Sequence, residues 1–549
     1  MNGADAIVKA IAQEGIDTVF GYPGGAIMPL YDALLQAPFK HILMRHEQAA
    51  ALAADGYARV RGNVGVCLAT SGPGATNLIT GIANAFLDSV PMVAITGQVA
   101  TPVLGTDAFQ EVDVFGLTMP VVKHSFLTKT PADLGEALAQ SFHLARSGRP
   151  GPVVVDVPKD VMLAKATSHP VFEDTSDQPL PDPAAIRKAN QLLESCRRPL
   201  IYSGGGVSMG QALSAFRDLV ARTGIPVVTT LKGIGNLPGD HPLFLGMLGM
   251  HGLKSANLAV QECDLLLVIG ARFDDRATGK LAEFAPNAAV IHCDVDAAEI
   301  GKLRQVEASL TEPLNLTLPL LVLDPINPHW VNRCVSRVHA YRSRPQTRTR
   351  GIYAPRLLNN LSRVLSPEAI VTCDVGQHQM WVAQHMRFAR PACHLSSGGL
   401  GTMGYGLPAA IGACYANPQA PVLCVTGDGS LMMNIQEFTT IVREQLPIKI
   451  LLFDNQSLGM VRQWQELFFQ ERFSQIDLSD NPDFCTVALA FGLPAMRFER
   501  PSQEPNIIQA ITQVAGPLLL HVRIDPNDKV WPLVAPGQPN HHMMEGVSK

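Results

Sequence analysis

The stretch that decides the fold is PVLCVTGDGS at residues 421–430, together with IKILLFDN at residues 448–455. Each begins with an apolar run of the length of a buried strand and ends in small and polar residues. The residues between them, 431–447, contain an amphipathic stretch. We therefore predict two parallel strands joined by a helical crossover, with their polar ends at one edge of a sheet.

The polar ends of these two strands suit a metal and a diphosphate. Asp428 offers the hard anionic oxygen that Mg²⁺ prefers, and Asn455 offers a neutral oxygen. Gly427 and Gly429 allow backbone amides to approach a diphosphate. A further ligand is expected near Ser457. Alone, Gly-Asp-Gly is also a common turn, and that interpretation stays open for the motif by itself.

The whole composition describes a buried globular protein that works on small molecules. The 549 residues are 47% hydrophobic and 17% charged, with a net charge of -5. No long run of Lys or Arg marks a nucleic-acid binder. Ten cysteines without a C-x-x-C pair predict reduced thiols, and with no signal-peptide pattern at the N-terminus this indicates the cytoplasm. Residues 391–427 lack charges, but Gly and Pro interrupt any membrane span.

The chain divides into three α/β units, each expected to have a mainly parallel sheet flanked by helices. Short β-branched runs such as VGVCLAT (64–70) and PVVVDVP (152–158) alternate with helical periods. We place an N-terminal domain at 1–167, a linker at 168–184, a central domain at 185–323, a second linker at 324–351 and a C-terminal domain at 352–549. Glycine-rich turns at 71–86 and 397–413 suggest an ancient duplication of the outer domains.

Glu47, in RHEQAAALAADGYAR (45–59), is a candidate catalytic acid. It begins a helix whose following residues are small and apolar, and desolvation there would favour a protonated carboxyl group. The alternative is a glutamate that only stabilises the helix dipole.

These motifs together resemble the acetolactate synthase family of thiamine diphosphate enzymes. GDGS followed by LLFDN resembles the thiamine diphosphate signature, and the segment around Glu47 resembles that of the activating glutamate. GYPGGAIMPLYDAL (21–34), GTDAFQEVD (105–113), GMLGMHG (246–252) and DNQSLGMVRQWQELFF (454–469) resemble acetolactate synthases in detail. The resemblance covers nearly the whole chain and implies the fold of the pyruvate oxidase and decarboxylase type.

The resemblance assigns the cofactor site. It implies that Glu47 acts on a thiamine diphosphate held by another subunit, so that a homodimer is the smallest working unit. The implied Mg²⁺ ligands are Asp428, Asn455 and Ser457. The implied diphosphate contacts are Gly376, Gln377, His378, Gly427, Gly429 and Ser430. Met403 would support the bent cofactor, a task suited to a flexible thioether, although plain core packing is the alternative.

The resemblance also implies a substrate channel and a flavin site. Arg276 would clamp the carboxylate of the second keto acid, and Trp464 would distinguish 2-ketobutyrate from pyruvate. Gly25, Phe109, Gln110, Lys159, Met250 and Met460 would line the same channel, with Gln110 and Lys159 near the reacting groups. GGGVSMG (204–210) follows a strand, and its resemblance implies a structural FAD held by Arg149, Gly205, Gly206, His251, Arg272, Asp274, Asp294 and Val295.

The activity implied is that of a transferase. It would condense pyruvate with pyruvate or 2-ketobutyrate, with loss of carbon dioxide, at the start of valine, leucine and isoleucine synthesis. A separate regulatory subunit is expected, because no sensor domain is recognisable in the chain. Two alternatives stay open from the sequence: a flavin-dependent pyruvate oxidase, and a binding or regulatory protein without activity.

Overall fold

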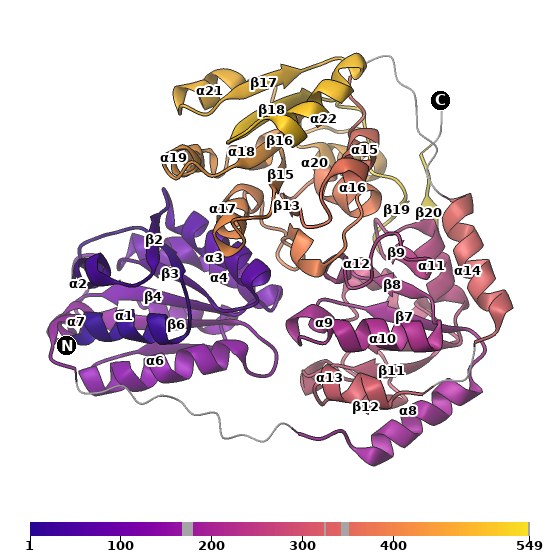
Figure 1. The fold of residues 1–549 in the computed structure, drawn as a ribbon, viewed down its shortest axis with the longest axis horizontal. Helices are drawn as coiled ribbons and strands as arrows, with labels where there is room; N and C mark the ends of the chain where they lie inside the picture. Colours follow the sequence, from indigo (N-terminus) through magenta and orange to yellow (C-terminus); the bar gives the residue numbers. More distant parts are fainter. Residues whose placement is uncertain (167–178, 323–325, 342–350, 547–549) are drawn as a thin grey trace.

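The computed structural model describes residues 1–166, 179–322, 326–341 and 351–546, and these form three α/β units (Figure 1). Each unit contains a six-stranded sheet in which every strand pair is parallel. The apolar runs seen in the sequence form the strands, because β-branched side chains buried on both faces suit a parallel sheet. The predicted α/β class with three parallel sheets is confirmed.

The N-terminal sheet has the order β2-β1-β3-β4-β6-β5. Its strands are β1 (Thr18–Gly21), β2 (Lys40–Leu43), β3 (Gly65–Ala69), β4 (Met92–Gln98), β5 (His124–Leu127) and β6 (Pro152–Pro158). Its helices are α1 (Gly3–Gln13), α2 (Met28–Ala33), α3 (Glu47–Arg61), α4 (Pro73–Leu87), α5 (Val114–Thr118), α6 (Pro131–Arg146) and α7 (Lys159–Leu163). One face packs on α1, α2, α6 and α7, and the other on α3 and α4.

The central sheet has the order β12-β11-β10-β7-β8-β9. Its strands are β7 (Pro199–Ser203), β8 (Val227–Thr229), β9 (Phe244–Met247), β10 (Leu265–Ile269), β11 (Ala289–Cys293) and β12 (Ala308–Leu310). Its helices are α8 (Pro183–Ser195), α9 (Gly206–Met209), α10 (Leu213–Thr223), α11 (Lys254–Glu262), α12 (Asp275–Thr278), α13 (Leu314–Thr317) and α14 (Pro328–Ala340). Counted within the domain, the order is 3-2-1-4-5-6, which is that of doubly wound dinucleotide-binding folds.

The C-terminal sheet has the order β14-β13-β15-β16-β18-β17. Its strands are β13 (Ile370–Cys373), β14 (His394–Ser396), β15 (Val422–Gly427), β16 (Ile448–Asp454), β17 (Ala495–Phe498) and β18 (Leu518–Arg523). Its helices are α15 (Ala354–Val364), α16 (Gln377–His385), α17 (Gly406–Ala416), α18 (Asp428–Leu431), α19 (Phe438–Arg443), α20 (Gly459–Phe468), α21 (Phe484–Ala490) and α22 (Glu504–Gln513). Within its domain this order equals that of the N-terminal sheet, as a duplication would require.

Helices α3 and α17 form the contact between the two outer domains. They lie between the N-terminal and C-terminal sheets and share one hydrophobic core (Figure 1). A methyl group on Gly412 would meet the Ala53 carbonyl oxygen at 1.9 Å, and one on Gly56 would meet the Ala409 carbonyl oxygen at 2.4 Å. The helices therefore approach so closely because glycine is present on both.

The second predicted linker, 324–351, is more structured than its composition suggested. Its described part contains α14, whose buried Trp330 donates from its indole nitrogen to the Pro199 carbonyl oxygen at 2.9 Å. Arg337 on the same helix pairs with Glu262 at 2.7 Å. Residues 168–178 of the first predicted linker lie outside the described residues, as do 324–325 and 342–350 of the second.

The end of the chain returns to the central domain. Strands β19 (Leu533–Val534) and β20 (Met543–Met544) form a small antiparallel ribbon beside α11 and α14 (Figure 1). The Val534 amide donates to the Met250 carbonyl oxygen at 2.8 Å, and the Asn540 amide group donates to the Ala277 carbonyl oxygen at 2.8 Å. The C-terminal segment thus holds the loops that follow β9 and β10.

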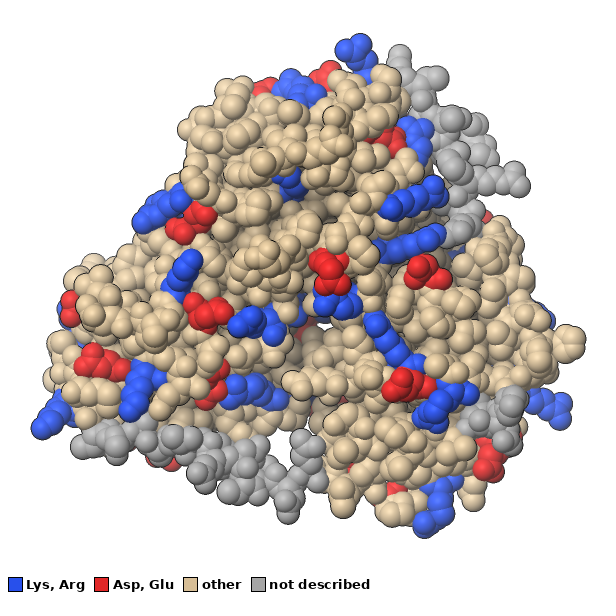
Figure 2. All heavy atoms as spheres, in the orientation of Figure 1, with Lys and Arg blue, Asp and Glu red and all other residues tan. Residues whose placement is uncertain are grey.

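Charged side chains are interspersed on the face shown in Figure 2, which is hollowed near its centre where the three domains meet. Among the described residues, no helix is long and apolar enough to cross a membrane. All ten cysteines are unpaired thiols.

Candidate active site

One large cavity gathers the predicted site residues of the central and C-terminal domains. Its volume is about 1490 Å³. The cavity wall contains eighteen of the residues predicted for cofactors and four of those predicted for substrates: Arg149, Gly205, Gly206, Met250, His251, Arg272, Asp274, Arg276, Asp294, Val295, Gly376, Gln377, His378, Met403, Gly427, Asp428, Gly429, Ser430, Asn455, Ser457, Met460 and Trp464.

The predicted metal and diphosphate residues lie where the strand order of the C-terminal sheet reverses, between β13 and β15. Open parallel sheets bind ligands at such points, beyond the carboxyl ends of the strands. Gly376 follows β13 with φ 147°, and Asp428 begins α18 directly after β15. Asn455 follows β16, the next strand. Residues far apart in the sequence therefore meet at one sheet edge.

Three buried polar atoms here have no hydrogen-bond partner among the described residues: Asp428 Oδ2, Ser457 Oγ and His378 Nε2. Leaving such atoms unsatisfied is costly, so several together indicate a missing polar ligand. The Asn455 amide oxygen accepts from the Ser457 amide at 3.0 Å, which keeps both residues in one tight turn. The donor set of a carboxylate, an amide and a hydroxyl fits an oxygen-loving cation and a diphosphate.

Burial shifts the ionisation of this group. Burial and the nearby Asp454 carboxylate raise the pKa of Asp428 to about 7. Burial lowers the pKa of His378 to about 3, so its ring is neutral. Both shifts are those of groups that lack a counter-ion, and a cation beside Asp428 would restore its charge. Within the described ranges, no cluster of three or more His, Cys, Asp or Glu side chains is placed to hold a metal.

Met403 lies in a turn, residues 397–405, that reaches over this edge of the sheet. A methyl group on Gly429 would lie 3.6 Å from the Met403 methyl carbon, so the thioether faces the α18 turn. The turn is fixed by Asp374, whose carboxylate accepts from the Gly404 amide at 2.8 Å and from the Gly406 amide at 3.1 Å. Met403 is thus held above the predicted diphosphate site.

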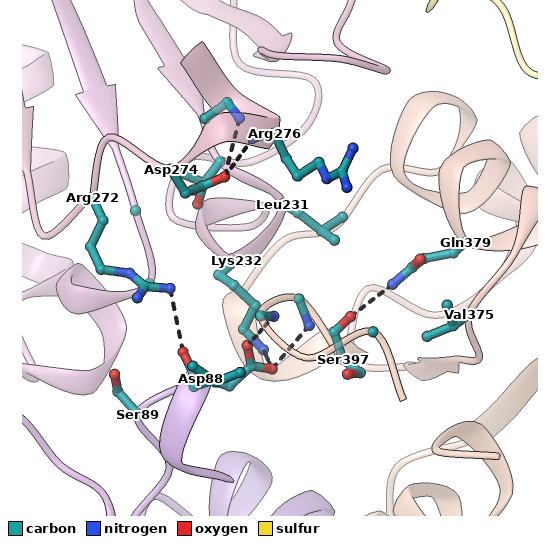
Figure 3. Close-up of a pocket in the computed structure, with 18 of the residues that line it drawn as sticks. Asp88, Ser89, Leu231, Lys232, Arg272, Asp274, Arg276, Val375, Gln379 and Ser397 are labelled. Carbon is teal, nitrogen blue, oxygen red and sulfur yellow. Dashed lines mark hydrogen bonds and ion pairs between the residues drawn. The ribbon is translucent and has the colours of Figure 1, made fainter. Parts of the chain in front are cut away.

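The residues predicted for the second substrate surround the same cavity. An Arg276 guanidinium nitrogen lies 3.5 Å from the Met250 sulfur, and 62% of the Arg276 side chain is exposed. Figure 3 shows its guanidinium reaching away from the neighbouring Asp274. Trp464 stacks edge-on against Phe468, with ring centroids 5.5 Å apart, on α20, which also carries Met460. The Arg276 guanidinium also lies 3.6 Å from the exposed Asp275 carboxylate. A cation and an aromatic wall therefore face one space.

The central domain opens the cavity at its own reversal of strand order, between β7 and β10. Gly204 and Gly206 follow β7 and pack on Gly270 after β10, where methyl groups would meet backbone atoms at 2.2 and 2.7 Å. This close approach leaves a groove for a ligand at the carboxyl ends of both strands. Arg272, Asp274, Asp294 and Arg149 line the groove, and Arg149 pairs with Asp296 at 3.2 Å.

Apart from Arg149, the predicted site residues of the N-terminal domain do not line this cavity. Glu47, Gly25, Phe109, Gln110 and Lys159 lie instead at the carboxyl-end edge of their own sheet. Within one chain, the proposed acid is therefore not brought together with Asp428.

The Glu47 side chain lies against helix α4. Its Oε2 accepts a hydrogen bond from the Asn77 side-chain amide at 2.9 Å. A methyl group on Gly74 would lie 3.4 Å from its Oε1. One carboxyl oxygen of Glu47 is therefore hydrogen-bonded to Asn77, and the other faces Gly74.

A buried ion network that sequence reasoning missed joins the three domains. The Asp88 carboxylate accepts from Arg59 at 2.7 Å, from Lys232 at 3.1 Å, and from the amides of Gly398 and Gly399 at 3.1 and 2.7 Å. Figure 3 shows Asp88 and Lys232 pointing toward each other at the cavity wall. The available signal was the charged pair of Asp55 and Arg59 in a helix of mostly small residues, where Arg59 also contacts Asp55 at 2.6 Å.

Three family models match the chain in order. They are the N-terminal thiamine pyrophosphate binding domain at residues 1–117, the central domain of thiamine pyrophosphate enzymes at 186–321, and the C-terminal thiamine pyrophosphate binding domain at 374–522. The match supports the assignment of the C-terminal edge to a diphosphate.

The chain is also similar to curated proteins over its full length. It is 53% identical to the acetolactate synthase isozyme 2 large subunit of Escherichia coli (strain K12), covering 100% of both chains. It is 47% identical to the acetolactate synthase large subunit of Parasynechococcus marenigrum (strain WH8102), over 99% of this chain and 91% of that one. It is 44% identical to the isozyme 1 large subunit of Escherichia coli (strain K12), over 99% and 97%.

Proposed function

Because the chain belongs to the family of acetolactate synthase large subunits, which are thiamine pyrophosphate enzymes, we propose that it joins pyruvate to a second 2-keto acid with loss of carbon dioxide. The second acid is pyruvate or 2-ketobutyrate, and the products lead to valine, leucine and isoleucine. The observation that carries the proposal is the set of unpartnered buried atoms around Asp428, in one cavity with Arg276 and Trp464.

Asp428, Asn455 and Ser457 hold Mg²⁺ together with the cofactor diphosphate. A carboxylate at the end of a strand and an amide oxygen from the next strand supply only part of an octahedral shell, which suits an ion that keeps cofactor oxygens and water. The diphosphate lies against Gly376, Gln377, His378, Gly427, Gly429 and Ser430. When bound, thiamine diphosphate supplies the carbon nucleophile that attacks the first keto acid.

Glu47 is the acid that activates the cofactor, and it acts on the C-terminal domain of a partner subunit. The proposal of a homodimer is supported by the separation of Glu47 from the cavity of its own chain. Exposed apolar side chains near the same edge also favour a covering surface, since 87% of Phe109 and 57% of Met28 are exposed. Gly25, Phe109, Gln110 and Lys159 then reach the partner's cavity with Glu47.

Arg276 binds the carboxylate of the second keto acid, and Trp464 sets the room for its side chain. A guanidinium that is free on one side matches a carboxylate in two parallel hydrogen bonds. The selectivity from one methylene is about 1–3 kcal/mol, so Trp464 can bias the choice of keto acid about 10- to 200-fold. Met250 and Met460 complete the apolar wall.

A FAD in the central groove is structural. The sheet order and the glycines after β7 support a dinucleotide there, with its pyrophosphate at Gly205 and Gly206. Arg149, His251, Arg272, Asp274, Asp294 and Val295 line that groove. The condensation has no net redox change, so the flavin would stabilise the shape of the protein and take no electrons.

Two further features are proposed. We place the enzyme in the cytoplasm, because ten unpaired cysteines suit a reducing compartment. We also expect a separate small regulatory subunit, in keeping with the large-subunit names of the relatives.

Product analysis tests the reaction. The full-length protein, with Mg²⁺, thiamine diphosphate and FAD, is given pyruvate and 2-ketobutyrate in competition. We expect acetolactate and 2-aceto-2-hydroxybutyrate. Hydrogen peroxide and acetyl products in their place would show a pyruvate oxidase, and no turnover would show a protein without activity.

Mixing two inactive variants tests the division of the site between subunits. Glu47→Ala removes the activating acid, and Asp428→Ala removes a proposed Mg²⁺ ligand. Each homodimer should therefore be inactive. A mixed dimer has one intact site, made from Glu47 of one chain and Asp428 of the other. Recovery of activity after refolding the two together is expected, whereas its absence, with mixed dimers present, would overturn the division.

A further inference from the structure

The segment that leads into α3 is held by the C-terminal domain of the same chain. The carboxylate of Glu437 is fully buried, and its Oε1 accepts from the Arg45 backbone amide at 2.9 Å. Its Oε2 accepts from the Thr440 hydroxyl at 2.7 Å. Arg45 stands two residues before Glu47, so this contact fixes the backbone from which the proposed acid projects.

The other side of Glu437 is joined to the metal half of the cavity. It ends a short 3-10 helix, Ile435–Glu437, that follows closely on α18. The Glu437 amide donates to the Asn434 carbonyl oxygen at 3.0 Å, and the Asn434 side chain donates to the Gly404 carbonyl oxygen at 2.7 Å. Glu437 is therefore tied to the helix of Asp428 and to the turn of Met403.

Burial also decides which substitution is informative. It raises the pKa of Glu437 to about 7, although hydrogen bonds from Thr440 and from the Arg45 amide oppose the rise. At neutral pH the side chain is therefore divided between its neutral and charged forms. Glutamine keeps the size and one acceptor oxygen, whereas alanine removes both oxygens.

We propose that Glu437 is a positioning residue for Glu47 of its own chain, acting through the backbone amide of Arg45. The proposal rests on the proposed function, in which Glu47 serves the site completed by the partner's C-terminal domain. The C-terminal domain of each chain then holds the metal of one site and aligns the acid of the other. The two sites of a dimer are coupled through this side chain.

The first test measures cofactor activation separately from turnover. In the holoenzyme, exchange of the cofactor's reactive C–H proton for deuterium is followed by NMR after acid quench. We expect Glu437→Ala to slow this exchange and kcat about 10- to 100-fold, because misplacing a reacting group by about 1 Å has that effect. The KM for pyruvate should stay within about twofold, and Glu437→Gln should recover most of the rate.

A matched control is Glu504, a second buried glutamate of the C-terminal domain, which pairs with Arg356 at 2.9 Å and does not contact α3. Glu504→Ala should lower thermal stability without slowing the exchange. Equal slowing in both variants would mean that general loosening explains the result, and it would overturn the proposal. Normal exchange in a folded Glu437→Ala enzyme would overturn it as well.

The second test asks which chain needs Glu437, using the mixed dimers of Glu47→Ala and Asp428→Ala chains. In such a dimer the working acid belongs to the Asp428→Ala chain. Adding Glu437→Ala to that chain should reduce the recovered activity at least about tenfold, as in the homodimer. Adding it to the Glu47→Ala chain should change the recovered activity by less than about twofold.

The outcomes separate the two claims. Adding Glu437→Ala to the Glu47→Ala chain could reduce the recovered activity as much as adding it to the Asp428→Ala chain. Glu437 would then act on the metal site of its own chain, and the positioning role would be wrong. If the parent mixture recovers no activity, the divided site is wrong, and the exchange rate of the Glu437→Ala homodimer still decides whether Glu437 positions Glu47.

Discussion

Replacing Gly81 with alanine tests how tightly α3 is enclosed. Gly81 lies on α4, and a methyl group there would be 2.4 Å from the Ala51 methyl carbon on α3. Two methyl carbons in contact need about 3.5–4.0 Å. The helices must therefore separate by more than about 1 Å, or the variant must strain.

The energies follow from this geometry. Overpacking costs about 1–3 kcal/mol, and the better helix propensity of alanine returns about 1 kcal/mol, so Gly81→Ala should destabilise by up to about 2 kcal/mol. Ala51→Gly alone loses a buried methyl group and helix propensity, again about 2 kcal/mol. The double variant moves the methyl group across the interface and should lie within about 1 kcal/mol of the wild type.

The assay is urea unfolding of the four proteins, followed by far-ultraviolet circular dichroism. A strong negative coupling, about -3 kcal/mol, is expected between the two substitutions. Gly412→Ala with Ala53→Gly is the contrast, because there the obstacle is the Ala53 carbonyl oxygen and no side chain can relieve it. Additive effects in the first pair, or a stabilised Gly81→Ala, would refute the described packing.

Three other outcomes are expected. Asp88→Asn should destabilise by about 3–5 kcal/mol in thermal unfolding, because it leaves Arg59 and Lys232 underpaired in a buried place, and a loss below 1 kcal/mol would contradict that. Burial raises the pKa of Asp156 from 3.8 to about 7, so its stabilising contribution is complete below about pH 4 and is lost as the pH rises to 7. Asp156→Asn should thus gain up to about 4 kcal/mol relative to the wild type between pH 4 and 8 in urea titrations, and a flat difference would count against it. Mg²⁺ and thiamine diphosphate at 100 times their Kd should raise the unfolding free energy by about 2.7 kcal/mol, and Asp428→Asn should remove this shift; an unchanged shift would place the metal elsewhere.

The strands and the edge of the sheet proposed for Mg²⁺ could be predicted because both depend on short local patterns of apolar and polar residues. Asp428 and Asn455 each close a β-branched run, so their meeting follows from the parallel arrangement alone. The predicted strand at 152–158 matches β6, and the quoted stretch at 421–430 contains the whole of β15. The roles of the individual site residues stay predictions.

Contacts between residues far apart in the chain could not be predicted from the sequence. Asp88 looks like an ordinary polar residue after a helix, and its partners Lys232 and Gly398 come from other domains. Their meeting depends on how three sheets are placed, which no local pattern encodes. Likewise the Pro and Arg content of residues 324–351 predicts a linker, whereas burial of Trp330 fixes α14 on the central domain.

The central groove has walls from all three domains, with Arg149 from the first, Gly205 and Arg272 from the second and Gly398 from the third. A dinucleotide seated there would bridge the three domains near the place where Asp88 also joins them. Its removal should therefore change the hydrodynamic radius of the molecule before any strand unfolds. In this way a coenzyme without a redox task would serve as an architectural element, and selection would preserve its binding for shape alone.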